Sequence, residues 1–163
     1  MKKGIFYATS TGNTREVAFK IAKALGIPDA DVHDVAVTAP DAVGRYDLII
    51  MGSPTYGSGE LQPKFSDFLD GVSVLNLKGR KVAVFGLGDE SMTDTFCNAV
   101  GEIYKRMKAT GSEMVGAFPT YPYEFDHSEA VPVQGAEAEG LLIDLVNHPE
   151  VTDSRIADWV RTL

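Results

Sequence analysis

Cysteine is nearly absent from this sequence: Cys97 is the only one among 163 residues. An intrachain disulfide and a multi-cysteine metal site are therefore both excluded. No apolar run approaches the roughly 20 residues that span a bilayer. The start, MKKGIFYATSTGN, has two lysines but no cleavage site typical of a signal peptide. From these absences we expect a cytoplasmic protein that does not associate with membranes.

Positive charge is also missing from a long segment. Residues 109–154 contain no lysine or arginine but many aspartates and glutamates, and the formal net charge is −8. Binding to nucleic acid, which depends on cationic contacts to phosphates, is therefore not expected. Two interpretations of the acidic segment stay open, namely a solvated surface and a docking surface for basic partner proteins.

The remaining composition is that of an ordinary globular protein, with 44% hydrophobic and 23% charged residues. The length is typical of one domain, so we expect residues 1–163 to form a single domain.

Apolar runs alternate with amphipathic segments along the whole chain. We expect strands over 3–8, 32–37, 47–53, 81–88 and 113–118, and helices from Val17 to Gly26, from Pro63 to Val72, from Phe96 to Gly111 and from Thr152 or Asp153 to Leu163. Five strands that alternate with helices predict an α/β fold with a doubly wound parallel sheet. Such sheets bind ligands in the loops that follow the carboxyl ends of their strands.

The first of these loops, TSTGNT (residues 9–14), lies between the first strand and the first helix. Hydroxyl groups and free backbone N–H groups at a helix start are suited to binding a phosphate. An elaborate helix cap is the alternative, because serine, threonine and asparagine are favoured there. The density of hydroxyl side chains favours the phosphate site.

The third and fourth strands lead into SPTYGSGELQP (53–63) and GLGDESMTDTF (86–96). Tyr56, surrounded by Pro54, Gly57 and Gly59, could form a plate for a flat ligand. The dinucleotide motif GxGxxG and the nucleotide motif GxxxxGK[ST] are both absent. A nicotinamide dinucleotide or a nucleoside triphosphate therefore lacks its usual binding motif here. For Tyr56, partly buried packing is the simpler alternative.

Together these motifs resemble the flavodoxins. TSTGNT is similar to their (S/T)x(S/T)GxT phosphate loop, and SPTYGSGEL and GLGD are similar to their second and third loops. YEFDHSEA (123–130), GLLID (140–144) and TDSRIADWV (152–160) resemble the closing part of the long-chain flavodoxins. In that subfamily an extra loop interrupts the fifth strand.

The resemblance implies that FMN is the cofactor, with no catalytic residue and no metal. The implied cofactor-binding residues are Thr9, Ser10, Thr11, Gly12, Asn13 and Thr14 at the phosphate, and Pro54, Thr55, Tyr56, Gly57, Ser58, Gly59, Leu87, Gly88, Asp89, Met92 and Thr95 around the remainder of the molecule. Met92 and Thr93 stand where the family often has a tyrosine, and Val146 stands where it often has an acidic residue.

The implied function is that of a low-potential one-electron carrier, a monomer that shuttles electrons between redox proteins through bound FMN. Its partners would be basic proteins such as a flavodoxin reductase and an electron-accepting enzyme. Two alternatives stay open: an FMN-dependent oxidoreductase of the quinone-reductase kind, and a cofactor-free receiver-like signalling module.

Other reactive side chains have simpler interpretations. We expect Cys97 to be a small core residue on the long helix and Trp159 to be a packing residue on the last helix. The histidines at 33, 127 and 148 have neither metal-site spacing nor a neighbouring nucleophile motif, so we expect them at the surface.

Overall fold

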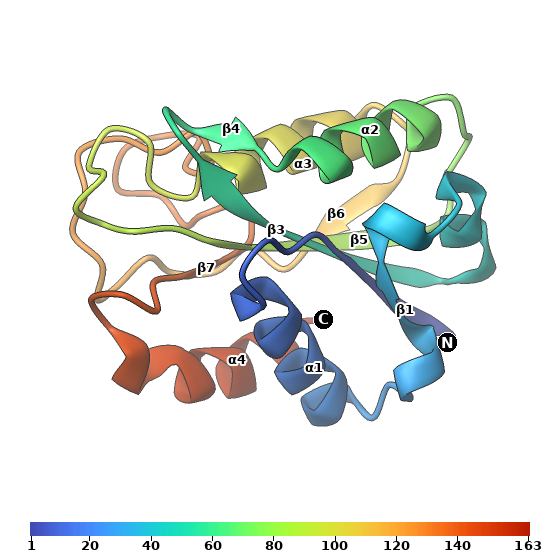
Figure 1. Ribbon diagram of the computed structural model, residues 1–163, viewed down its shortest axis with the longest axis horizontal. Coiled ribbons are helices and arrows are strands. Elements are labelled where there is room, and N and C mark those ends of the chain that lie inside the picture. Colours follow the sequence, from blue (N-terminus) through green and yellow to red (C-terminus); the bar gives the residue numbers. More distant parts are fainter.

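The structure, a computed structural model, describes residues 1–163 and consists of one twisted β-sheet with helices on both faces (Figure 1). The strand order is β2-β1-β3-β5-β6, and the neighbours along this path are parallel. The strands are β1 (Lys3–Tyr7), β2 (Val32–Asp34), β3 (Leu48–Tyr56), β4 (Glu60–Leu61), β5 (Lys81–Leu87), β6 (Glu113–Val115) and β7 (Leu141–Ile143). The predicted doubly wound parallel sheet is confirmed.

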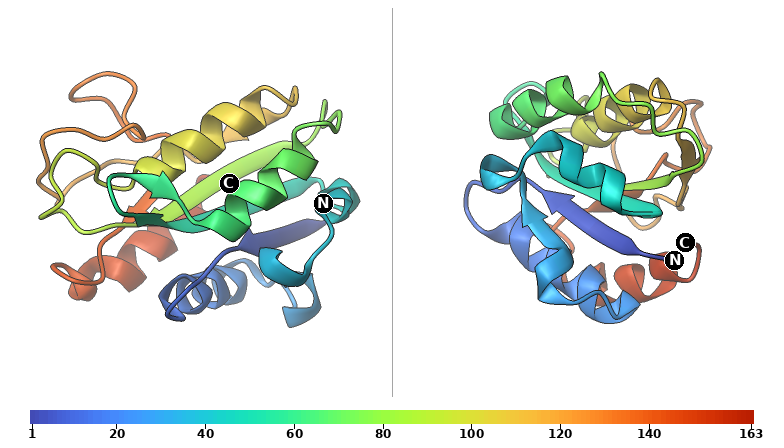
Figure 2. Two further views of the ribbon diagram at one scale, coloured as in Figure 1. Left: turned by 45° about the horizontal axis from the view of Figure 1, so that its top comes forward. Right: turned by 90° about the vertical axis from the view of Figure 1, so that its right-hand side faces the viewer.

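Two pairs of helices cover the two faces of the sheet. Figures 1 and 2 show α1 (Asn13–Leu25) and α4 (Thr152–Val160) on one face, and α2 (Pro63–Val72) and α3 (Asn98–Lys108) on the other. Short 3-10 turns lie in the connections at Asp29–Asp31, Val35–Val37, Pro40–Arg45 and Pro149–Val151. None of the helices combines the length and apolar character that crossing a bilayer requires.

The sheet separates two apolar clusters, one beneath each pair of helices. Successive side chains of a strand point to opposite faces, so Ile5 and Phe6 are both fully buried but belong to different clusters. A strand covered on both faces needs apolar residues at every position, which explains the unbroken apolar runs.

Several boundaries differ from the predicted ones. α1 begins at Asn13, before Val17, and β3 continues to Tyr56, past residue 53.

Two further differences have local causes. β2 ends at Asp34 instead of residue 37, because the Asp34 carboxylate accepts a hydrogen bond from Ala36 N (2.9 Å) and begins a 3-10 turn. The long helix α3 begins at Asn98 instead of Phe96, because Cys97 has the left-handed backbone angle φ 50°. Phe96 and Cys97 are buried as expected, but both precede the helix.

The later boundaries also lie inside the predicted ones. α3 ends at Lys108, three residues before Gly111. β6 ends at Val115 instead of residue 118, because Gly116 adopts φ 88° and turns the chain out of the sheet. The last helix ends at Val160, so Leu163 lies beyond it.

The fifth strand of the sheet is divided, as expected from the long-chain resemblance. β6 and β7 both pair with β5 in parallel, with Val115 opposite Ala83 and Leu141 opposite Phe85. Residues 116–140 form an insertion between them, which lies beside the loop after β5 at one end of the sheet (Figures 1 and 2).

The insertion approaches the remainder of the protein backbone to backbone. A Cβ atom at Gly101 of α3 would collide with the carbonyl of Glu129, and one at Gly140 would collide with the carbonyl of Val84. No side chain fits at either position, so these two glycines allow the insertion to leave and return close to the core.

Arg155 anchors the insertion from the α4 side. Its buried guanidinium donates hydrogen bonds to the carbonyls of Tyr121 (2.6 Å), Pro119 (2.9 Å) and Leu142 (3.3 Å). Trp159 on the same helix is fully buried and donates to the Gly116 carbonyl (2.8 Å), which confirms its expected packing role.

Candidate functional site

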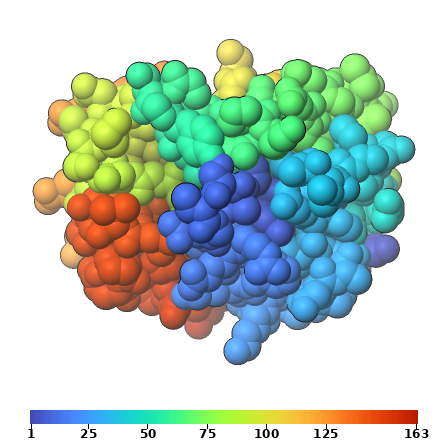
Figure 3. Space-filling view, in the orientation of Figure 1, coloured from blue at the N-terminus to red at the C-terminus, as the bar shows by residue number.

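One pocket lies at the carboxyl ends of β1, β3 and β5, where the strand order switches direction between β1 and β3. Its volume of about 410 Å³ is within the range of small-molecule sites. It is lined by Thr9, Ser10, Thr11, Asn13, Thr14, Pro54, Thr55, Tyr56, Gly57, Leu87, Gly88, Asp89, Met92, Thr95, Cys97, Leu145 and Val146. Figure 3 shows the chain segments that carry these residues meeting on one face of the molecule.

The phosphate loop (residues 9–14) presents free hydrogen-bond donors. The backbone N–H groups of Ser10, Thr11, Asn13 and Thr14 have no partner within the protein, whereas Gly12 N donates to Thr9 Oγ1 (3.0 Å). These N–H groups lie at the start of α1, where the helix dipole favours an anion. No side chain caps the start of α1, so these donors are left free in the way that anion binding requires.

No cation completes this cradle. Arg15, the nearest basic residue in the sequence, packs its guanidinium over the Phe19 ring at 4.6 Å and is exposed to solvent. An anion would therefore be bound by neutral donors and by the helix dipole.

The second loop, between β3 and β4, forms the next wall of the pocket. Tyr56 is half-buried at the end of β3, and a tight turn follows in which Gly59 N donates to the Tyr56 carbonyl (2.8 Å). Gly57 adopts φ 48° in this turn, a conformation that side chains with a Cβ adopt only with strain. The turn holds Tyr56 against the pocket.

The third loop (residues 88–95) forms a further wall of the pocket. Gly88 N donates to the Ile143 carbonyl (2.9 Å), which ties the start of the loop to β7. Hydrogen bonds from the Ser91 hydroxyl, the Ser91 N–H and the Asn147 amide hold the pKa of Asp89 below its usual value. Met92 is 52% exposed at the rim.

Three lining residues were not among those predicted. Leu145 and Val146 follow β7, and only the pairing of β7 with β5 brings them to the pocket. Cys97 lies at the pocket floor because its left-handed backbone turns the chain there, and burial raises the pKa of its thiol. The sequence had no local signal for Leu145 or Cys97, whereas Val146 was singled out only as a departure from the family.

Three predicted residues, Gly12, Ser58 and Gly59, lie outside the pocket lining. Gly12 has φ 94° and forms the turn into α1. Ser58 is exposed at the tip of the second loop, and Gly59 packs beneath the Asn98 side chain. Their positions shape the loops that carry the lining residues.

Two of the three histidines are not free at the surface, contrary to expectation. His33 is half-buried, with Nε2 2.6 Å from the Tyr46 hydroxyl, and burial lowers its pKa. His148 is also half-buried, with Nε2 2.7 Å from Glu90 Oε1, whereas His127 is exposed. No group of three or more histidine, cysteine, aspartate or glutamate side chains is arranged to hold a metal ion.

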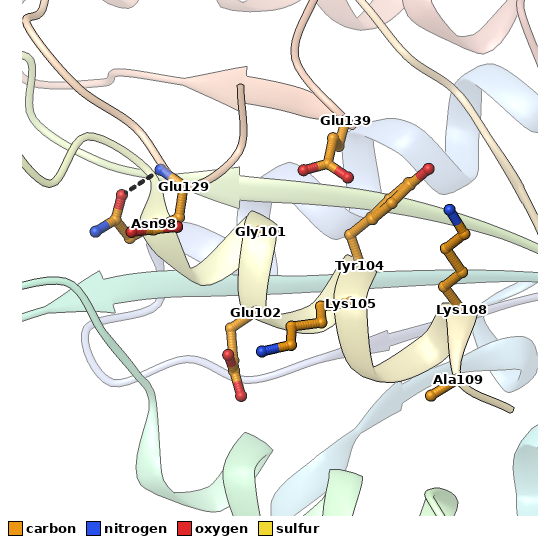
Figure 4. A pocket seen from close by; sticks show the side chains of 9 residues that line it. All are labelled: Asn98, Gly101, Glu102, Tyr104, Lys105, Lys108, Ala109, Glu129 and Glu139. Carbon is orange, nitrogen blue, oxygen red and sulfur yellow. Dashed lines mark hydrogen bonds between the residues drawn. The ribbon is translucent and has the colours of Figure 1, made fainter. Parts of the chain in front are cut away.

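A second hollow, of about 580 Å³, lies along the outer face of α3. Figure 4 shows that both lysine and glutamate side chains line it, and that Asn98 accepts a hydrogen bond from Glu129 N. This mixture of charges selects neither an anion nor a cation. The hollow also contains none of the predicted site residues, so the pocket at the switch point is the candidate site.

The comparisons with known proteins agree with this geometry. The family model described as Flavodoxin matches residues 5–159. Flavodoxin 1 of Escherichia coli K12 is 37% identical over 161 residues, which cover 98% of this chain and 91% of the relative. The flavodoxin of Synechocystis is 37% identical over 98% of this chain and 94% of its own length.

A solved structure shows the same arrangement of elements. The crystal structure of Fusobacterium nucleatum flavodoxin bound to flavin mononucleotide superposes with a TM-score of 0.89 and 27% identity, covering 99% of this chain and 96% of that chain. The family match over residues 5–159 and the two relatives at 37% identity show that this chain belongs to the flavodoxin family.

Proposed function

We propose that this protein is a one-electron carrier that binds one FMN in the pocket at the strand switch point. The observation that carries the proposal is the row of free N–H groups at Ser10, Thr11, Asn13 and Thr14, which opens into an apolar pocket. A flat ring that ends in a phosphate matches both features. Flavodoxins are themselves a standard example of ligand binding at this switch point.

In this proposal the phosphate loop binds the phosphate through neutral donors. The hydroxyls of Thr9, Thr11 and Thr14 add to the backbone N–H groups, and Gly12 supplies the turn that points those groups outward. Charge-assisted hydrogen bonds of this kind are stronger than neutral ones. The phosphate would therefore be the main determinant of affinity for FMN over riboflavin.

The second and third loops would enclose the ring. Tyr56 and Met92 lie on the two walls, and Leu87, Leu145 and Val146 add apolar surface. Pro54, Thr55, Gly57, Gly88, Asp89 and Thr95 would contact the ring or the sugar chain, while Ser58 and Gly59 shape the second loop. These walls exclude water from one side of the ring.

FMN would supply the one-electron chemistry, and the charges of the protein around it would set its reduction potential. Asp89 is the one acidic residue that lines the pocket, and the loops that form it also carry Glu60, Glu90 and Asp94. Negative charge disfavours a further negative charge on the reduced cofactor. The expected result is a low reduction potential.

Members of this family pass electrons between redox proteins and do not transform a substrate of their own. We propose that the partners here are basic proteins, such as a flavodoxin reductase and an electron-accepting enzyme, because residues 109–154 lack positive charge. We also propose that residues 1–163 act as one cytoplasmic domain and as a monomer. The quinone-reductase alternative is not favoured, because the relatives are flavodoxins.

The test compares two flavins. The apoprotein is titrated with FMN and with riboflavin, and binding is followed by flavin fluorescence. We expect Thr11→Ala/Thr14→Ala to weaken FMN binding by about tenfold or more, since hydrogen bonds to charged groups contribute roughly 1.5–3 kcal/mol each. Riboflavin binding should hardly change, because riboflavin has no phosphate.

Thr162→Ala, an exposed threonine at the far end of the chain, is the matched control and should leave both affinities unchanged. Equal losses for FMN and riboflavin in the double variant would contradict the phosphate assignment. A wild-type apoprotein that binds no FMN would contradict the proposed function itself.

A further inference from the structure

Two segments far apart in the sequence form one side of the flavin pocket. The third loop contributes Asp89 and Met92, and the turn after β7 (residues 144–150) contributes Leu145 and Val146. The two segments touch outside the regular ladder of the sheet. Their relative position therefore depends on side chains.

Asp144 is the first of these side chains. It is fully buried, and its carboxylate accepts hydrogen bonds from Glu90 N, Val146 N and Asn147 N, each 2.9 Å long. The Asn147 amide bridges the same carboxylate and Asp89, with both distances 2.8 Å. This contact fixes the base of the third loop.

Glu90 forms a second, outer contact. Its Oε1 lies 2.7 Å from His148 Nε2, and its Oε2 accepts a hydrogen bond from Glu124 N (2.8 Å) in the insertion. One carboxylate thus joins the third loop, the 144–150 turn and the insertion. The side chains of Glu90 and His148 are only 20% and 25% exposed, so their contact is partly shielded from water.

The surroundings of His148 favour its protonated form. Glu90 faces Nε2, and Glu150 Oε1 lies 3.5 Å from Nδ1. The Tyr123 ring of the insertion packs against the imidazole at 5.5 Å, and the Arg155 guanidinium lies on the Tyr123 ring at 4.7 Å. The hydrogen bond to Glu90 is the main cause that raises the pKa of His148 above its ordinary value; it outweighs the opposing effect of desolvation, and the charges of both glutamates add to it.

Protonation decides how many bonds the imidazole can donate. A neutral imidazole has one N–H, so it can donate to one of the two glutamates, whereas the protonated ring can donate to both. The bond to Glu90 is also stronger when both partners are charged. The contact therefore tightens as the pH falls through the pKa of His148.

We propose that Glu90 and His148 are positioning residues of the flavin pocket, and that the protonation of His148 makes FMN affinity depend on pH. The proposal rests on the proposed function. Neither residue lines the pocket; they act by holding the third loop, with Met92, against the turn that carries Val146. FMN should bind most tightly where His148 is protonated and more weakly as the pH rises.

The coupling has to be reciprocal. If protonation of His148 favours FMN binding, FMN binding must in turn raise the pKa of His148. The coupling free energy is the same in both directions. This second readout needs no variant, because the histidine signals of the wild-type protein can be followed by NMR across a pH titration, with and without FMN.

The experiment combines both readouts. We expect the wild-type dissociation constant for FMN to increase about threefold to tenfold between pH 6 and pH 9, an effect of the size expected for one partly exposed charged contact. In His148→Gln the constant should stay near the high-pH value at every pH. Glu90→Gln should also flatten the profile and should lower the midpoint of the His148 signal.

His127→Gln is the matched control, because His127 is exposed and lies 3.4 Å from Glu129, away from the pocket lining. It should keep the wild-type pH profile. A profile in His148→Gln that equals the wild-type profile, or a His148 midpoint that FMN does not move, would overturn the inference. Both outcomes differ from a failure to bind FMN, which would overturn the proposed function.

Discussion

The phosphate loop and the third loop line the same pocket but are built in opposite ways. Within the phosphate loop, the N–H groups of Ser10, Thr11, Asn13 and Thr14 have no partner in the protein. The third loop has few polar groups to spare, since Asp144, Asn147 and His148 hold Asp89 and Glu90 from behind. The first loop thus keeps its hydrogen-bonding capacity for a ligand, and the third uses it on the protein.

This difference has an energetic meaning. Ser10, Thr11 and Asn13 of the phosphate loop are exposed, whereas Thr14 is buried. The exposed donors are solvated when no ligand is bound, so changing Thr11 should affect affinity and leave the free energy of unfolding almost unchanged. The bonds that hold the third loop are partly or fully buried, so breaking them should lower the free energy of unfolding as well. Three predictions test the comparison, beginning with the largest expected effect.

Asp144→Ala should be the most damaging change. It removes the buried acceptor of three backbone N–H groups, and we expect the free energy of unfolding to fall by about 3 kcal/mol, measured by urea denaturation. Thr11→Ala, at an exposed position of the phosphate loop, should change it by less than about 0.5 kcal/mol. Similar losses for the two variants would remove the proposed contrast between the loops.

Substitutions of single residues in the second and third loops should change FMN affinity by an intermediate amount. Tyr56→Ala removes the aromatic side chain of the second loop and should weaken FMN binding by about tenfold, the size expected for one stacked ring. The residual flavin fluorescence should rise, because less of the ring is stacked. Met92→Tyr in the third loop should change both quantities in the opposite direction.

The rigid third loop makes the Met92 result informative. If its backbone is fixed by Asp144, a tyrosine at Met92 can cover the ring without a movement of the loop. Met92→Tyr that weakens FMN would show that the wall has no room for an aromatic ring. Unchanged affinity and fluorescence in Tyr56→Ala would mean that other groups hold the flavin.

The smallest effect is expected for charge. The third loop and the insertion carry Asp94 and Glu124 as exposed acids, whereas the phosphate loop carries none. Asp94→Lys and Glu124→Lys should slow electron transfer from a basic reductase several-fold without a change in FMN affinity, and salt should have a similar effect because the Debye length is about 10 Å at 0.1 M. Asp29→Lys, at an exposed position of the 3-10 turn after α1 and outside residues 109–154, is the control. A rate that is insensitive to salt would argue against electrostatic docking.

The loops that follow apolar strands were predictable from the sequence. TSTGNT follows β1, whereas SPTYG and GLGD begin within the carboxyl ends of β3 and β5. Apolar runs reveal all three strands, and the parallel topology brings their carboxyl ends together. The division of the fifth strand came from the resemblance, and the structure confirms it. The order of the strands was not predicted and comes from the structure.

Contacts between distant segments were not predictable. Leu145 reaches the pocket only through the pairing of β7 with β5, and His148 meets Glu90 across 58 residues of sequence. Cys97 was assigned to a helix because its left-handed backbone has no signature in the residue type. The periodicity of apolar residues indicates which positions are buried. It contains no information about which side chain from a distant segment each position contacts.

Because the fifth strand is divided, residues 116–140 could be replaced by a connection of a different length without changing the pairing of β6 and β7 with β5. Val115 and Leu141 pair with positions of β5 that are two residues apart, so the gap between them along the sheet is about 7 Å at the usual rise per residue. One residue in place of 116–140 would rejoin β6 and β7 into a continuous strand. For protein engineering, the sheet edge can thus accept inserts of very different length, provided that Gly101 and Gly140 remain free of side chains wherever the native path is kept.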